Sequence, residues 1–504
     1  MPDRSHFVLM AQEITRTWRR ALERYLQTFR ATSGQSLDDA LRLAATEHRI
    51  TLVGSPEVPC GVPQEVEDLL LSTHPGILLD RMSARTSAEL KELADRRAER
   101  NDRYGVRDGE ADIVEVSSRG KLGVDSLLPI HDNGQLTPTS SSTEVAGTGA
   151  HWVRLNFVLP PDKGVYHHGS WEGTGKAPWL KARFLATNRT WYDTFDELVD
   201  GFRARGLSIY ALVGAESTDP RWTPERMRND TTEAQECSDW VTRYAESFAE
   251  IVSHFRTRVK HYESFNEPNG WHGGNTHVLH PYWFARCLVE IYKAVVIDKG
   301  ITDVALVCGP IECPSFPSNL RDQYLEGRKA YLSETYRYID ADPNWAPYRA
   351  SHGYPFHGIG LHLYLYQNKY TSNQAVSSAL TQYVLGFHDL VKQKEGVTEA
   401  AEKKIYVSEI GWMSGDVSTS VEEARLREAN PDTRPGRGTL DTQKRYLNQA
   451  LTTLSALEEV GVVIWYGIQD TGEGPWGLFG QGPLEIANRK PSWAAFRELA
   501  AGAS

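Results

Sequence analysis

The stretch that decides the fold is YESFNEPN, residues 262–269, which follows a helical pattern at 240–258. A short β-like segment leads into Asn266, Glu267 and Pro268, and polar and glycine residues come after them. In a (β/α)8 barrel, the loops that follow the strands form the functional face. We therefore expect this strand end to carry the chemistry of the protein.

A second segment of the same character lies far along the chain. Residues 405–412 read IYVSEIGW, an apolar and β-branched run with one carboxylate, Glu409, near its end. A single glutamate is usually a surface charge. Burying an unpaired carboxylate is costly, so Glu267 and Glu409 at the ends of two apolar strands are better explained as functional groups.

The rest of residues 116–504 alternates strand-like and helical patterns, which is typical of a parallel sheet with crossover helices. This rhythm predicts one (β/α)8 barrel (a TIM barrel, fold class α/β). A long segment at 314–356, rich in Tyr and Pro, predicts a functional loop or an excursion with its own helices after the fifth strand. The eight predicted strands are 122–127, 151–157, 207–213, 259–265, 304–309, 359–365, 405–410 and 462–468.

Residues 1–115 predict a helical N-terminal extension. Apolar side chains recur there at three- and four-residue spacing, which places them on one helix face. That face must be covered, so we expect the extension to pack against the barrel. The residues of this face are Ile14, Trp18, Leu22, Tyr25, Leu26 and Phe29.

Composition narrows the class of partner. The 504 residues carry a net charge of −11, which argues against nucleic acid or an anionic membrane as a partner. Ten per cent of the residues are aromatic, and Trp and Tyr faces can stack on sugar rings. The apolar run at 7–10 is too short for a secretory signal or a membrane span, which predicts a cytoplasmic protein. The sequence leaves the oligomeric state open.

The histidines invite a metal interpretation. Zinc sites in barrels take ligands from several strand ends, yet the first predicted strand, 122–127, contains no histidine. We therefore predict neither a catalytic metal nor a cofactor. The histidines considered are His167, His168, His272, His277 and His280.

Five short motifs in barrel order resemble the glycoside hydrolases of clan A, whose acid and nucleophile lie on strands four and seven. The resemblance runs from about residue 121 to the C-terminus. The residues of the WVR and EIGW motifs are most similar to those of families 5 and 39. The N-terminal part has no counterpart in the basic clan pattern. The motifs are Asn266-Glu267-Pro268, SEIGW at 408–412, WVR at 152–154, HLY at 362–364, and Trp465.

The resemblance implies a role for the two glutamates and their neighbours. Glu267 would be the acid/base and Glu409 the nucleophile, while Asn266 would bind the sugar 2-hydroxyl. Arg154 would lie near the nucleophile and keep it ionised, although a structural ion pair is the alternative. Tyr364 would donate a hydrogen bond to Glu409.

Further residues would line the same site. His362 shares one strand face with Tyr364, since alternate residues point the same way. Trp465 would be the platform under the reacting sugar, although a core position is more common for a lone Trp. Trp271, Trp412 and Trp476 are expected near the mouth of the barrel.

These features predict a retaining glycoside hydrolase that acts on an oligosaccharide or glycoside. Glycosidic cleavage needs a proton donor and a second carboxylate, and two strand-end glutamates supply them. A transglycosylase with the same glutamate pair is an alternative. A non-catalytic carbohydrate-binding barrel is another, weakened by the presence of both glutamates.

Overall fold

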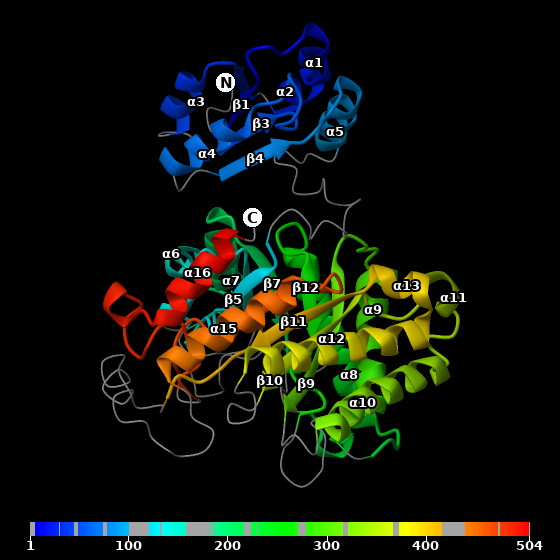
Figure 1. Cartoon of the computed structure of the whole chain (residues 1–504). Coiled ribbons are helices and arrows are strands. Elements are labelled where there is room, and N and C mark those ends of the chain that lie inside the picture. Colours follow the sequence, from blue (N-terminus) through cyan, green and yellow to red (C-terminus); the bar gives the residue numbers. More distant parts are fainter. Residues whose placement is uncertain are drawn as a thin grey trace. The chain divides into compact units, whose positions relative to one another are not determined.

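The chain divides into two compact units, Met1–Ile113 and Val114–Ser504, and each is described by itself (Figure 1). This boundary lies close to the one expected from sequence. The computed structural model describes residues 6–29, 31–44, 49–73, 78–99, 120–131, 134–157, 183–184, 187–215, 223–228, 230–270, 279–315, 321–365, 372–415, 439–471 and 474–502.

The first unit contains a four-stranded parallel sheet with strand order β2-β1-β3-β4. Its strands are β1 His6–Leu9, β2 Thr32–Gly34, β3 Arg49–Val53 and β4 Leu78–Met82. Its helices are α1 Arg16–Ala21, α2 Glu23–Phe29, α3 Leu37–Ala44, α4 Gln64–Thr73 and α5 Ser87–Glu99. The helical interpretation of residues 1–115 missed this sheet. Its strands are only three to five residues long, too short for a clear strand pattern.

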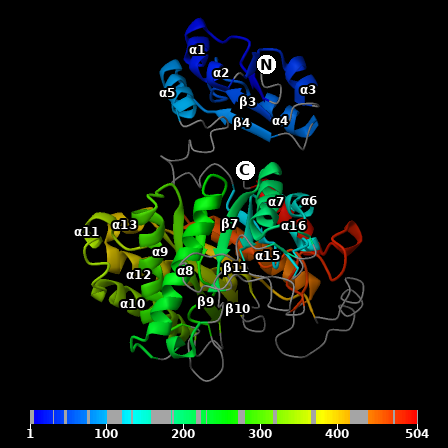
Figure 2. The same ribbon diagram turned by 180° about the vertical axis from the view of Figure 1, so that it is seen from behind.

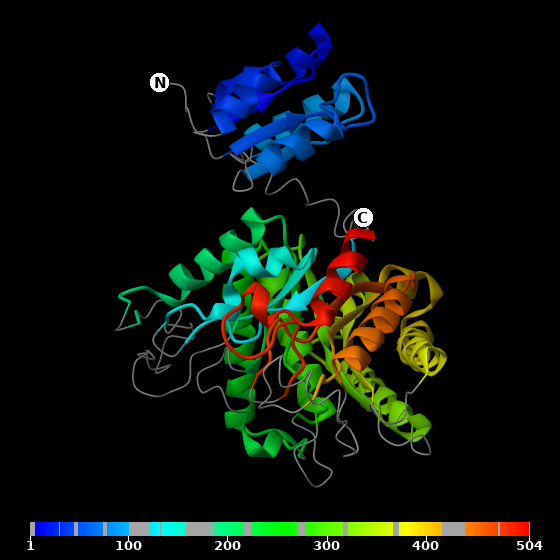
Figure 3. The same ribbon diagram turned by 60° about the vertical axis from the view of Figure 1, so that its left-hand side comes forward.

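Helices cover both faces of this sheet (Figure 3). Successive residues of β1 point into two separate cores, one on each face. Val8 faces α1, α2 and α5, and Phe7 faces α3 and α4. The apolar helix face expected from sequence is real, and it is covered within the unit. Leu22, for example, is fully buried there. The reason for expecting this face to pack against the barrel is therefore removed.

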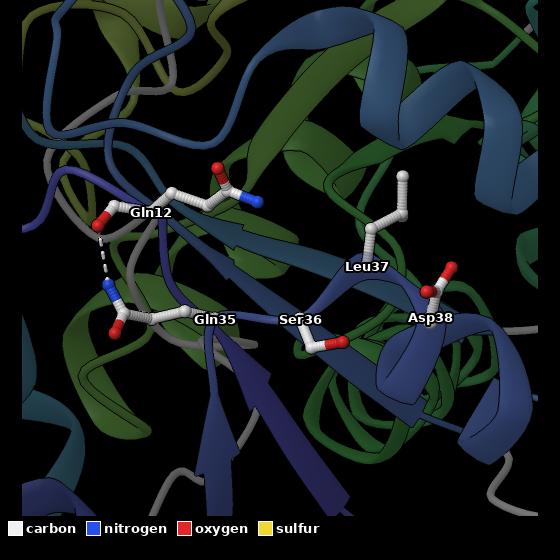
Figure 4. A pocket seen from close by; sticks show the side chains of 5 residues that line it. All are labelled: Gln12, Gln35, Ser36, Leu37 and Asp38. Carbon is white, nitrogen blue, oxygen red and sulfur yellow. Dashed lines mark hydrogen bonds between the residues drawn. The ribbon is translucent and has the colours of Figure 1, made fainter.

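A cavity of about 470 Å³ lies at the carboxyl ends of β1 and β2 (Figure 4). The Gln35 amide donates hydrogen bonds of 2.8 Å to the backbone carbonyls of Ala11 and Gln12. Gln35 thus ties the loop after β1 to the segment that enters α3. The lining residues are Gln12, Gln35, Ser36, Leu37 and Asp38.

Because its two cores close on themselves, a fragment of residues 1–113 is expected to fold alone. It should unfold cooperatively on heating, as followed by circular dichroism. Leu22→Ala should cost about 2–5 kcal/mol of that stability. The matched change at exposed Leu69, 41% accessible, should alter it by about 0.5 kcal/mol at most. A fragment without a cooperative transition would contradict this expectation.

The second unit is a closed barrel of eight parallel strands, which confirms the predicted (β/α)8 fold. Each observed strand overlaps one of the predicted segments. The strands are β5 Leu122–Asp125, β6 Trp152–Asn156, β7 Ser208–Val213, β8 His261–Ser264, β9 Ala305–Ser315, β10 Gly358–Leu365, β11 Lys404–Ile410 and β12 Val460–Trp465.

Helices surround these strands (Figures 1 and 2). They include α6 Ser142–Gly147, α7 Trp191–Ala204, α8 Gln235–Phe255, α9 Pro281–Tyr292, α10 Arg321–Ala341, α11 Arg349–His352, α12 Asn373–Glu395, α13 Val397–Glu402, α15 Leu440–Ser455 and α16 Pro491–Gly502. A π-helix, Lys293–Asp298, continues α9. Among the helices described, none combines the length and apolar character that crossing a bilayer requires.

The segment at 314–356 holds the fifth crossover of the barrel. Its long helix, α10, packs against β9, α9 and α12, as a barrel helix does. The segment carries helices, as one of the two expectations had it, and α10 serves as a crossover helix of the barrel. Tyr331 and Tyr336 of this segment are almost fully buried and serve packing.

The barrel interior is filled in layers. A cluster of large side chains occupies one layer, including Trp152, Tyr210 and Tyr406. Two residues further along β6 and β11 come Arg154 and Ser408, so the next layer toward the carboxyl ends is polar and buried. This polar layer lies directly beneath the site described next.

Candidate active site

Glu267 and Glu409 meet at the carboxyl end of the barrel. One oxygen of each carboxylate lies within 4.8 Å of the other and of a ring nitrogen of His362. Glu409 is largely buried, with a side chain 10% exposed, and Glu267 is more open at 29%. The structure thus brings together the two glutamates singled out from sequence, although 142 positions of the chain separate them.

The backbone after β8 aims Glu267 into the barrel. Phe265 and Glu267 adopt left-handed conformations, with φ of 66° and 46°. Such angles are uncommon for residues other than glycine and concentrate at functional sites. Phe265 turns outward, where its ring lies 6.1 Å from that of Tyr244 on α8. The chain then turns back, so that Glu267 faces the centre of the mouth.

A β-bulge aims Glu409. Leu361 pairs with Val407, but the next residue of β10, His362, pairs with Glu409, so Ser408 is the extra residue of β11. A bulge lets neighbouring side chains face the same way and is common beside active sites. Ser408 and Glu409 consequently both point into the barrel.

Two donors hold the Glu409 carboxylate, one on each oxygen. The Tyr364 hydroxyl donates to Oε2 at 2.5 Å, and Arg154 Nη1 donates to Oε1 at 2.5 Å. Both contacts were expected from the sequence resemblance. Burial raises the pKa of Glu409, and His362 and Arg154 oppose that rise. Arg154 therefore favours the ionised carboxylate against a strong cost of burial.

Arg154 forms hydrogen bonds with five side chains of the site. It is 1% exposed, and burial lowers its pKa while three carboxylates raise it, for a net rise. A guanidinium has only donors, so every partner must accept. Besides Glu409, the acceptors are Asp125 Oδ2 at 2.8 Å, Glu263 Oε2 at 3.2 Å, Asn266 Oδ1 at 3.3 Å and His362 Nε2 at 3.3 Å.

The position of Arg154 fixes the tautomer of His362. Nε2 must accept from Arg154, so the proton of the neutral ring lies on Nδ1. Burial lowers the pKa of His362 to about 3, so the ring is neutral at ordinary pH. Nδ1 therefore donates to Glu267 Oε1, at 2.6 Å.

Glu267, His362 and Glu409 are close enough to ligate a cation. For Nδ1 to bind a metal, the ring proton would have to move to Nε2. It would then face an N–H group of Arg154, so the donor set fits a hydrogen-bonded carboxylate pair better than a metal site. His280 accepts a hydrogen bond from Tyr282 N at the start of α9. Histidines 167, 168, 272 and 277 lie outside the described residues.

The aromatic residues are distributed differently from expectation. Trp465 points outward from β12, is fully buried and donates to the Trp476 carbonyl at 3.1 Å. Trp412 is 2% exposed, and its ring lies 3.8 Å from that of Tyr446. Neither is placed as a sugar platform in the described structure. Alternation along β12 instead turns the residue after Trp465, Tyr466, inward.

Trp476 lies beside Tyr364, the residue that donates to Glu409. It is partly exposed, and its ring centre is 5.3 Å from that of Tyr364 and 6.4 Å from that of Tyr466. Tyr364, Tyr466 and Trp476 therefore form an aromatic wall at the mouth. Position 271, also considered near the mouth, is outside the described residues.

Sequence reasoning missed part of the site. Asp125 of β5 and Glu263 of β8 are fully buried carboxylates. The argument that a lone acid in an apolar strand needs a function would have found Asp125, whereas Glu263 lies among other polar residues of β8. Ser408 and Tyr466 gave no such signal. A β-bulge in β11 turns Ser408 inward, and alternation along β12 turns Tyr466 inward.

The raised pKa of Glu409 predicts the acid side of the pH profile. If Glu409 must be ionised, activity falls as pH drops through its raised pKa, so the acid limb should lie above the range of an ordinary glutamate. Tyr364→Phe removes a donor to the anion and should move this limb to higher pH. Measurements of kcat/KM against pH for the wild type and for Tyr364→Phe check both expectations. An acid limb below pH 4 in the wild type would contradict the expected position of that limb.

No family model and no curated protein matches this sequence. Among solved structures, a family 39 glycoside hydrolase from the gut symbiont Bacteroides cellulosilyticus WH2 has a TM-score of 0.46 and 16% identity over 77% of this chain, which spans 65% of that chain. A fungal β-1,4-galactanase has a TM-score of 0.43 and 13% identity over 75% of this chain and 98% of its own. A family 1 β-glucosidase from Thermotoga maritima has a TM-score of 0.44 and 12% identity over 77% and 98%.

Proposed function

We propose that the barrel is a retaining glycoside hydrolase that acts through a covalent glycosyl-enzyme intermediate. One observation carries the proposal: a carboxylate oxygen of Glu267 lies within 4.8 Å of one of Glu409. Retaining pairs are about 5–5.5 Å apart, whereas inverting pairs are about 6.5–9.5 Å apart to admit a water. The separation supports direct attack by a carboxylate.

In the first step, Glu409 attacks the anomeric carbon and forms an ester while the glycosidic bond breaks. Protonated Glu267 gives its proton to the leaving oxygen. In the second step, ionised Glu267 takes a proton from water, whose oxygen attacks the anomeric carbon and releases Glu409. Glu409 suits the first role because Tyr364 and Arg154 hold both of its oxygens. Glu267 suits the second because it is open enough to meet water.

Neighbouring groups support these steps. The His362 N–H stabilises Glu267 whenever that carboxyl is ionised. Asn266 turns its oxygen to Arg154, which leaves its amide N–H groups for a sugar hydroxyl. The aromatic wall of Tyr364, Tyr466 and Trp476 supplies apolar surface of the kind that binds a sugar face.

A panel of nitrophenyl glycosides of different sugars and both anomeric configurations tests the proposal. We expect the wild type to release nitrophenol from at least one, and Glu409→Gln to abolish that release. Because both carboxylates are present, we disfavour a non-catalytic barrel. Binding of sugars without turnover of any glycoside would support it instead.

Transglycosylation uses the same glutamate pair and a sugar in place of water in the second step. Product analysis with an added sugar acceptor separates the two outcomes. We expect the free sugar to dominate at low acceptor concentration. Transfer products that dominate there would make the protein a transglycosylase.

A further inference from the structure

Glu263 is a third buried carboxylate beneath the glutamate pair. It lies on β8, four residues before Glu267, and is fully buried. Its oxygens receive hydrogen bonds from Arg154 Nη2 at 3.2 Å, from the Tyr210 hydroxyl at 2.8 Å and from the Ser408 hydroxyl at 2.7 Å. Glu263 does not touch the open mouth, so it cannot meet a substrate directly.

Two glycines on neighbouring strands leave space for the Glu263 carboxylate. A Cβ atom at Gly360 of β10 would lie 2.3 Å from Glu263 Oε1, and one at Gly309 of β9 would lie 2.8 Å from its Cγ. Two neighbouring strands thus carry glycine where any side chain would expel the Glu263 carboxylate. Such a cradle, together with hydrogen bonds from β6, β7 and β11, holds the group in one position.

Resting on the proposed function, we propose that Glu263 is a positioning residue: it holds one side of the Arg154 guanidinium so that the other side is presented to the nucleophile Glu409. Arg154 uses Nη2 toward Glu263 and Nη1 toward Glu409. A guanidinium is planar and rigid, so fixing one nitrogen orients the other. Glu263 would therefore act on the reaction through Arg154.

Glu263 would also affect the pKa of Glu409, because both carboxylates interact with the positive charge of Arg154. Burial raises the pKa of Glu263, while Arg154, Ser408 and Tyr210 lower it. All three are donors to it, which suits an ionised carboxylate. A negative charge on the far side of the guanidinium disfavours ionisation of Glu409 and keeps that nucleophile more basic.

Other ionisable and charged groups face this pair from every neighbouring strand. Around Glu409 they are Asp125 of β5, Arg154 of β6, Glu267 after β8, and His362 and Tyr364 of β10. Around Glu263 they are Arg154 of β6, Tyr210 of β7, Cys308 of β9, and Ser408 of β11.

The test compares the titration of Glu409 in the wild type and in Glu263→Gln. The glutamine can turn its oxygen to Arg154 and its amide N–H groups to the hydroxyls, which can accept. Proteins labelled with carbon-13 at the glutamate carboxyl are titrated by NMR, and the Glu409 signal is identified by its absence in Glu409→Gln. We expect its midpoint to fall by about one pH unit in Glu263→Gln. The acid limb of kcat/KM should shift by the same amount.

Two further variants make the result specific. Tyr210→Phe removes a donor to Glu263 and should shift the midpoint in the same direction by less. Glu395→Gln is the matched control, because Glu395 is a buried carboxylate that also accepts from a tyrosine, Tyr336, and a cation, Lys403. It should lower stability and leave the Glu409 midpoint unchanged.

An unshifted or raised Glu409 midpoint in folded Glu263→Gln would overturn the proposal, because the glutamine oxygen can still accept from Arg154 and only the negative charge is lost. If that variant does not fold, an unshifted midpoint in Tyr210→Phe would overturn it. An equal shift in Glu395→Gln would do the same, since it would show a general effect of lost buried charge. The NMR midpoint needs no turnover, so an inactive wild type would reject the proposed hydrolase function and leave this test intact.

Discussion

Replacing Glu409 with glycine is expected to lower kcat/KM for a nitrophenyl glycoside by roughly 10⁴-fold or more. The nucleophile is lost, and a cavity opens under the anomeric carbon. Tyr364 and Arg154 remain as donors around that cavity. A small anion should therefore bind there and restore part of the rate.

Azide makes this expectation specific. In Glu409→Gly it should attack the anomeric carbon from the side of the missing carboxylate and give a glycosyl azide of opposite anomeric configuration. Wild type with azide is the control and should give no such product. Thermal unfolding of the variant checks that its fold is intact. Full activity in folded Glu409→Gly would remove Glu409 from the mechanism.

Glu267→Gln has the second-largest expected effect. Loss of the proton donor should lower kcat/KM by roughly 10²–10⁴-fold for substrates with poor leaving groups. Substrates whose leaving groups need little protonation, such as dinitrophenyl glycosides, should suffer least. The alkaline limb of the pH profile, which reflects ionisation of Glu267, should disappear.

The comparison between leaving groups is the decisive part of this prediction. Glutamine keeps the size of the side chain and can still accept from His362. A purely structural effect would slow good and poor substrates equally. Such an equal loss, or an alkaline limb that persists, would reject Glu267 as the acid.

The barrel was predictable because each of its strands has a strong local signal. The interior and the helices together bury β11, so its sequence reads as an apolar run in which a lone carboxylate stands out. Glu409 could be found for that reason, and Glu267 because it stands in Asn266-Glu267-Pro268 at the end of a strand-like segment. The resemblance to clan A implied that Tyr364 and Arg154 lie beside Glu409, whereas the contact of His362 with Glu267 was not predicted.

What sequence reasoning missed depends on single-residue geometry. The bulge at Ser408 and the left-handed Phe265 leave no mark in a hydrophobic pattern, although they decide which side chains face inward. The direction of Trp465 was misjudged because a strand of apolar residues shows no alternation. The sheet of the first unit was not predicted because its strands are short and the helical patterns around them are stronger.

The measurement that tests the central claim most directly is the anomeric configuration of the first-formed product. Proton NMR follows the wild type acting on a nitrophenyl glycoside that the panel identifies as a substrate, before mutarotation equilibrates the sugar. Because carboxylate oxygens of Glu267 and Glu409 lie within 4.8 Å of each other, we predict that the first sugar released keeps the configuration of the substrate. A first product of inverted configuration would contradict the account.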